Sequence, residues 1–300
     1  MAATTTSPTE TSRTRRRKSG STLGIGERRS VNAALGALAW LVALLFFFPI
    51  FWLVISSFKE ELDAVGTPKV VFTPSLDRYR EVTETTSGIL SFGKAFSNSA
   101  FVVLLSTAIV LVMAIPAAYA LAIRPVRKWR DVLLFFISTK FLPMVASILP
   151  LYILAKQFHL LGTRTVLVIL YTAMNLPLAV WMLRSFFQEV PRELIEAAEI
   201  DGAGLRGQLT SVILPIAVPG IAATALLCMI FAWNEYFFAL QLNSAAAQTI
   251  PIWVTTNINE KANFLAKLSA ASVIASLPVV LAGWAAQKRM IRGLAMGAIK

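Results

Sequence analysis

The run VILPIAVPGIAATALLCMIFAWNEYFFAL (residues 212–240) decides the fold class of this chain. It holds 29 residues, and its one charged side chain, Glu235, comes near its end. A bilayer core of about 30 Å needs roughly 20 apolar residues of helix, so this run is long enough to cross a membrane. It therefore predicts a transmembrane helix.

Five further runs meet the same length requirement. They are residues 33–56, 100–123, 132–155, 166–186 and 268–286. The chain is 56% hydrophobic and only 15% charged, which is too apolar for a soluble domain of 300 residues. The first run is also longer than the roughly 7 to 15 apolar residues of a cleavable signal peptide. We therefore predict an all-α, polytopic membrane protein with six transmembrane helices.

The formal net charge of +12 follows the expected topology of the membrane helices. Basic residues stand in short blocks between the apolar runs and form no continuous patch, which argues against a nucleic-acid partner. With the N-terminus inside, the inner segments hold 18 Lys and Arg and the outer segments nine. Because Lys and Arg accumulate on the cytoplasmic side, we expect both termini in the cytoplasm. Residues 1–30 are expected to form a disordered basic cytoplasmic tail before a transmembrane domain over 31–300.

The densest acidic cluster lies in the loop of residues 189–211, directly before the fifth apolar run, and this topology places it in the cytoplasm. Its apolar residues recur at helical spacing, opposite its acidic ones. We expect the helix to stop at Asp201 and Gly202, because glycine tolerates the left-handed backbone that ends helices. A helix lying on the membrane surface would carry Lys and Arg, so the acidic face favours docking on a partner protein. The apolar face consists of Pro191, Leu194, Ile195 and Ala198, and the acidic face of Glu193, Glu196 and Glu199.

This loop resembles the EAA motif of the permease subunits of binding-protein-dependent ABC importers. The motif is Glu-Ala-Ala, a glycine four positions later, and then an aliphatic residue, any residue, Leu and Pro. Four other segments, PIFWLVISSFK, AAYALA, AWNEYFFAL and RGLAMGAIK, are similar to the smaller six-span permease of maltose-type carbohydrate uptake systems. The basic tail departs from the family pattern. The matching motif positions are Glu196, Ala197, Ala198, Asp201, Gly202, Ala203, Val212, Leu214 and Pro215.

The resemblance implies the fold of an ABC type I importer permease in the inner membrane, with the acidic loop as its cytoplasmic coupling helix. The implied partners are a second homologous permease, two copies of an ABC ATPase and an extracytoplasmic sugar-binding protein. ATP and Mg would be bound by the ATPase, so no cofactor or metal is expected in this chain. No Walker A, HExxH or GxSxG pattern occurs, so we expect no enzyme activity in it. The residues expected to dock on the ATPase are Glu196, Ala197, Ala198, Asp201, Gly202 and Ala203.

Several residues within or beside the spans have two interpretations. Prolines at the start of the fifth span would bend the helix as a hinge, or are ordinary membrane prolines. A lysine inside the third span indicates either a substrate pathway or a structural ion pair. Polar residues in the fourth and fifth spans could contact substrate or bond between helices. The candidates are Pro215 and Pro219 for the hinge, and Lys140, Asn175, Asn234 and Glu235 for the pathway.

The sequence leaves the transported compound open. A carbohydrate is the first hypothesis, but ISTKFLPMVASILPLY also looks like permeases for sugar alcohols, and glycerol phosphate systems use the same fold. A secondary transporter would need acidic residues or an ion site inside the membrane, and the spans hold almost none. A membrane scaffold without transport activity would leave the acidic loop unexplained.

Overall fold

The computed structural model describes residues 25–65, 69–84, 86–87, 90–124, 127–141, 144–243, 247–256 and 265–297. The chain divides into two compact units, Met1–Phe51 and Trp52–Lys300. The tail of residues 1–24 lies outside the described residues, so its disorder stays a prediction. The first predicted span is confirmed as one helix, α1 (Ile25–Ser56), which contains Pro49.

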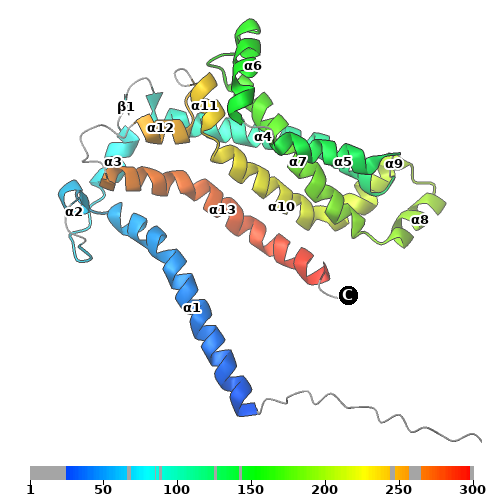
Figure 1. The fold of residues 1–300 in the computed structure, drawn as a ribbon, viewed down its shortest axis with the longest axis horizontal. Helices are drawn as coiled ribbons and strands as arrows, with labels where there is room; N and C mark the ends of the chain where they lie inside the picture. The colour runs from blue at the N-terminus through cyan, green and yellow to red at the C-terminus, as the bar shows by residue number, and fades with distance from the viewer. Residues whose placement is uncertain are drawn as a thin grey trace, which may run out of the picture. The chain divides into compact units, whose positions relative to one another are not determined.

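Four more of the predicted spans contain long helices of the second unit, but the predicted span 212–240 is too long, because its last residues belong to a separate short helix, α11 (Phe237–Leu242) (Figure 1). The four long helices are α4 (Phe92–Ala122), α7 (Arg164–Gln188), α10 (Leu214–Trp233) and α13 (Leu265–Gly297). Each contains a proline, which membrane helices tolerate when neighbouring helices satisfy the freed backbone groups. With α1, five described helices are long and apolar enough to cross a membrane.

The prediction of one continuous helix over residues 132–155 is wrong. The structure has α5 (Trp129–Ser138), a 3-10 turn η1 (Thr139–Phe141) and α6 (Met144–Gln157) there, and the two helices run in different directions (Figure 1). The sequence carries Pro143 at the break, and a proline has no N–H to donate to the carbonyl of Thr139. Neither α5 nor α6 alone has the roughly 20 residues that a bilayer requires.

The long helices of the second unit pack into a bundle with two distinct ends. α7 lies along α4, and α10 packs against α4, α7 and α13. The C-terminal ends of α4 and α7 meet where Arg184 Nε donates a 3.2 Å hydrogen bond to the carbonyl of Leu121. This end also carries α8 (Arg192–Ile200) and α9 (Leu205–Gly207), at the right in Figure 1, and we call it the α8 end.

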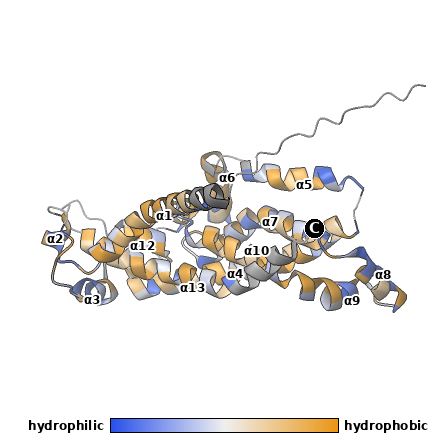
Figure 2. Cartoon of the chain, turned by 90° about the horizontal axis from the view of Figure 1, so that it is seen from below, coloured by the Kyte–Doolittle hydropathy of each residue, from blue (hydrophilic) through white to orange (hydrophobic). Residues whose placement is uncertain are grey.

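The opposite end, which we call the hairpin end, is built from short elements. It holds α2 (Glu61–Val65), α3 (Asp77–Glu84), α11 (Phe237–Leu242), α12 (Ile250–Thr256) and a small antiparallel pair, β1 (Thr86–Ser87) with β2 (Leu90–Ser91). Hydrophilic residues gather in α2, α3 and α8, whereas the long helices are largely hydrophobic (Figure 2). The polar surfaces of the described chain therefore lie at the two ends of the bundle.

Each end has its own hydrophobic core. One cluster of buried side chains surrounds Trp253 and includes Phe92, Val102 and Leu167. The second surrounds Leu183 and Phe187 and reaches Ile195 of α8. The bundle thus supports both ends with buried apolar packing, and α8 takes part through a single buried residue.

Candidate functional site

The helix predicted in the acidic loop is confirmed as α8. It follows Pro191, whose fixed φ suits the start of a helix, and it ends at Asp201. Gly202 then adopts a φ of 78°, the left-handed conformation expected of a glycine after a helix. The N–H of Ala203 donates to the carbonyl of Ala198 at 2.9 Å, which closes the last turn.

Most of the surface of α8 is exposed. Ile195 is buried against the bundle, but Leu194 and Ile200 of the same helix remain 45% and 87% exposed. Exposed apolar side chains on a short amphipathic helix favour a protein partner at this surface. The predicted docking residues are all gathered here: Glu196, Ala197, Asp201 and Gly202 are exposed, and Ala198 and Ala203 are half-buried.

A network of polar side chains attaches α8 to the bundle, and no motif or periodicity in the sequence predicts it. Glu199 pairs with Arg124, which follows α4. Gln208 donates to Glu199 Oε1 at 3.4 Å and to the carbonyl of Ala203 at 3.0 Å. Tyr119 of α4 donates its hydroxyl to Gln208 Oε1 at 2.8 Å. The end of α8 is therefore linked to both α4 and the start of the fifth span.

Gln208 opens a π-helical segment, η2 (Gln208–Ile213), directly before α10. The N–H of Leu214 bonds to the carbonyl of Leu209, five residues back instead of four. Single π turns inside α-helices are frequent at functional sites. The predicted hinge residues lie just beyond it, with Pro215 at the start of α10 and Pro219 inside that helix.

Arg184 ties together three helices near α8. Its Nε bonds to Leu121 of α4, its Nη1 donates to Gln188 Oε1 at 2.9 Å, and its guanidinium stacks 4.0 Å from the ring of Trp129 in α5. Only 8% of its surface is exposed. A planar guanidinium is suited to this combination of stacking and directed bonding, so Arg184 serves as a structural clamp at the α8 end.

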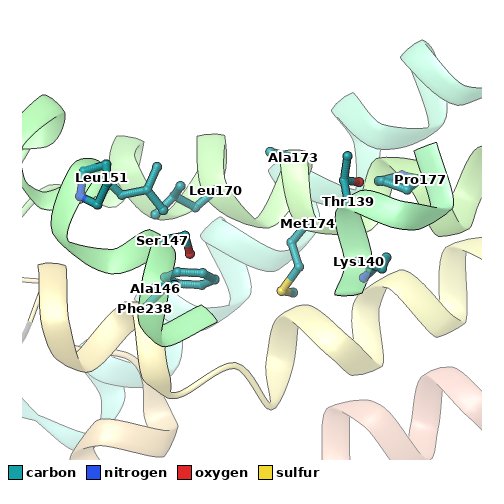
Figure 3. A pocket seen from close by; sticks show the side chains of 11 residues that line it. Thr139, Lys140, Ala146, Ser147, Leu151, Leu170, Ala173, Met174, Pro177 and Phe238 are labelled. Atoms are coloured by element: carbon teal, nitrogen blue, oxygen red, sulfur yellow. The ribbon is translucent and has the colours of Figure 1, made fainter. Parts of the chain in front are cut away.

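A cavity of about 500 Å³ lies beside the break in the third span (Figure 3). Its walls come from η1, α6, α7 and α11, and most of the lining side chains are apolar. Lys140 lines it, is exposed, and lies 5.6 Å from the ring of Phe231. The other polar lining residues are Thr139 and Ser147.

The other three residues predicted for the substrate pathway do not line this cavity. Asn175 is buried, and its amide lies 3.5 Å from the carbonyl of Cys228, between α7 and α10. Glu235 accepts from the backbone N–H groups of Phe238 and Ala239, so its carboxylate caps the start of α11. Asn234 is exposed and donates to the carbonyl of Ile230. Asn175 and Glu235 are both buried and bonded to backbone groups of this chain, so their assignment to the pathway stays a prediction.

Residues 114–294 match the family model described as "Binding-protein-dependent transport system inner membrane component". A sulfoquinovosyl glycerol transport system permease of Agrobacterium fabrum is 34% identical, over 84% of this chain and 88% of that protein. A trehalose/maltose transport system permease of Thermococcus litoralis is 31% identical, over 87% and 94%.

The fold has a solved counterpart. A crystal structure of a bacterial ABC transporter involved in the import of the acidic polysaccharide alginate contains a chain that aligns with a TM-score of 0.69 and 24% identity. The alignment covers 87% of this chain and 96% of that one. At this level of identity the likeness concerns the fold alone.

Proposed function

Because the chain belongs to the family of inner membrane components of binding-protein-dependent transport systems, we propose that it is the permease subunit of an ABC importer for carbohydrate. The relatives named above carry saccharides or a sugar glycoside, according to their names. The observation that carries the proposal is α8, an acidic amphipathic helix with uncovered apolar residues at one end of a bundle of membrane helices.

α8 is the element by which a separate ATPase acts on this chain. Its exposed Leu194 and Ile200 offer apolar contact area, and Glu193 and Glu196 present negative charge to a basic cleft of the ATPase. The chain has no phosphate-binding loop of its own, so ATP and Mg belong to the ATPase subunits. Two ATPase copies, a second permease and an extracytoplasmic sugar-binding protein complete the importer. The α8 end and both termini then face the cytoplasm.

The cavity beside the third span lies on the substrate pathway. A volume of about 500 Å³ suits a small saccharide. A lysine inside a membrane segment is costly against lipid, so exposed Lys140 faces water or protein in the assembled importer. Broken membrane helices are common at transport sites, because their ends supply unpaired backbone groups. The break between α5 and α6 therefore supports a pathway here more strongly than the buried Asn175 or the capping Glu235.

The docking role can be tested by comparing two glycines in the same loop. A Cβ at Gly202 or Gly204 would meet nothing within 4 Å, so neither position is sterically filled. Gly202 has a φ of 78°, which a β-branched residue adopts only with strain, whereas Gly204 has a φ of −68°. We expect Gly202→Val to lower sugar uptake by about tenfold or more through displacement of the end of α8. Gly204→Val is the matched control.

The assay uses the importer reconstituted in proteoliposomes with its ATPase, second permease and binding protein. The probes are radiolabelled maltose, trehalose, raffinose, mannitol and glycerol 3-phosphate, which also decide between sugar, sugar alcohol and glycerol phosphate. Co-purification of the ATPase with each variant measures docking. Full uptake and normal ATPase retention by Gly202→Val would remove α8 as the docking element. Lack of ATP-dependent uptake of every probe by the wild-type assembly would overturn the proposed substrate class.

A further inference from the structure

We propose that Tyr119 and Gln208 are positioning residues that transmit the movement of α8 to α4. The proposal rests on the function proposed above, because it assumes that an ATPase moves α8. It goes beyond that function by naming the internal contact through which the movement enters the membrane helices.

The apolar contact between α8 and the bundle is small. Ile195 is the one buried residue within α8, and Leu194 beside it is 45% exposed. A single buried aliphatic side chain resists displacement weakly, since its stabilisation is proportional to the small apolar area that it buries. Much of the attachment of α8 to the bundle must therefore come from the polar contacts of Glu199 and from the segment that leads from α8 to Gln208.

Gln208 connects three parts of the molecule through one amide group. It is 2% exposed. Its nitrogen donates toward Glu199 of α8 and to the carbonyl of Ala203 in the following loop, while its oxygen accepts from Tyr119 of α4. An amide has two N–H donors and one carbonyl oxygen, so both kinds of group on this side chain are engaged. No apolar side chain of similar size could replace these contacts.

The bonds of this network differ in how easily they break. Arg124 and Glu199 are each about half exposed, and such an ion pair exchanges with water at little cost. Tyr119 and Gln208 are buried, and separating them would leave two buried polar groups without partners. When α8 moves, the exposed Arg124–Glu199 ion pair can separate, but the buried hydrogen bond between Tyr119 and Gln208 is kept. A displacement of Gln208 therefore displaces Tyr119, and Tyr119 displaces α4.

The π-helical segment gives Gln208 room to move relative to α10. A π turn holds more than the 3.6 residues of an α turn, so residues before and after it face different directions from those in an unbroken α-helix. Gln208 is its first residue, and Ile213 at its far end is fully buried in the core of the bundle. A change of pitch in this segment can shift Gln208 while Ile213 and α10 stay anchored.

Two buried tyrosines provide a matched test. Tyr119→Phe removes only the hydroxyl that bonds to Gln208. Tyr171→Phe removes a similarly buried hydroxyl, which donates to the carbonyl of Glu235 at 3.3 Å and belongs to the hydrophobic core of the hairpin end. In the reconstituted importer, the measured quantity is sugar transported per ATP hydrolysed, using the panel probe with the highest wild-type uptake. We expect about a three- to tenfold fall for Tyr119→Phe and none for Tyr171→Phe.

A double-mutant cycle separates transmission from general damage. If the two residues act through their shared bond, Tyr119→Phe combined with Gln208→Leu should lower the ratio no further than Gln208→Leu alone. ATPase co-purification should stay near wild type in Tyr119→Phe, and its fall in melting temperature should be no larger than that of Tyr171→Phe, which also removes a buried hydroxyl. Equal ratios in both tyrosine variants, or losses that multiply in the double variant, would overturn the proposal.

A second test uses the exposed part of the network. Glu199→Leu should lower the ratio because it removes the acceptor of the Gln208 amide, and Glu199→Gln, which keeps an oxygen acceptor there, should lower it less. Equal ratios in these two variants would remove Glu199 as the point where α8 joins the network. A wild-type assembly that imports normally while these variants behave as wild type would refute the inference and leave the proposed function intact.

Discussion

The two ends of the bundle are held together by different kinds of contact. At the hairpin end, side chains bond to the backbone of distant segments. Asn98 donates to the carbonyl of Gln248 at 2.9 Å, Ser99 accepts from the N–H of Ile250, and Trp253 donates to the carbonyl of Leu90. At the α8 end, the bonds to α8 run mainly between long side chains, several of them exposed.

This difference shows which end can move at low cost. A side chain bonded to the backbone of another segment fixes that segment in one position, especially when both groups are buried. Long side chains can keep or exchange their bonds while the helices that carry them shift. Elements with few buried apolar contacts and exposed bonds belong to the low-stability end of a structure. We therefore expect the hairpin end to be the fixed end, and α8 to be the part that moves at the lower cost.

The largest expected effect is at the hairpin end. Trp253 is 1% exposed, packs edge-on against Phe92 with ring centroids 4.9 Å apart, and bonds to Leu90. Trp253→Ala should lower the free energy of unfolding by about 3 to 5 kcal/mol, because it leaves a cavity. Thermal unfolding of the purified protein in detergent measures the change. Trp284→Ala, at a tryptophan that is 72% exposed, is the control. Similar losses in both would contradict a tightly fixed hairpin end.

A second prediction limits how far the mobile region extends. A Cβ at Gly220 of α10 would lie 2.2 Å from Cγ of Phe186 in α7, so these helices approach closely near the α8 end. Gly220→Ala should cost about 1 to 3 kcal/mol through overpacking. Gly283→Ala, in the open part of α13, should be neutral or slightly stabilising. An unchanged melting temperature in Gly220→Ala would mean that α7 and α10 separate easily, and that the mobile region extends beyond α8.

The smallest expected effect concerns pH and the hairpin end. Partial burial acts to raise the pKa of Glu81, but the neighbouring Lys267 and Arg78 outweigh it and hold that pKa below its ordinary value. A lowered folded-state pKa stabilises the fold above the unfolded pKa, and this stabilisation disappears as the pH falls through the folded pKa. The Lys267–Glu81 distance is 3.1 Å, and the partly exposed pair should contribute less than about 1 kcal/mol.

Melting temperatures of wild type and Glu81→Gln between pH 7 and pH 3 test this prediction. The wild type should be slightly more stable at pH 7, and the difference should vanish toward the acidic limit. A constant difference across this range would show that the charge of Glu81 is not responsible.

Five spans and the helix of the acidic loop could be predicted from the sequence, because their signals are local. Length and apolar character are sufficient for a membrane helix, and Pro191 and Gly202 mark the limits of α8. The third span could not be predicted in the same way. Its composition matches that of a membrane helix, while the break depends on a proline whose effect in membranes varies with its neighbours.

The candidate site shows the same division. The family motif grouped Glu196 to Ala203 without any knowledge of the fold, and in the structure most of these residues are exposed at the end of α8. Tyr119 and Gln208 lie 89 residues apart in sequence, and no periodicity connects them. The pathway candidates Asn175 and Glu235 looked alike as polar residues in spans, but one bonds between helices and the other caps α11.

The sequence by itself determined which segments enter the membrane and which short helix stands apart from it. Both follow from the free energy of moving each segment from water, which is a property of composition and length. Only the tertiary structure decided where the third span breaks, which polar groups meet, and how α8 is attached to α4. These depend on distances between residues far apart in the chain, and hydrogen bonds are formed only once packing has set those distances.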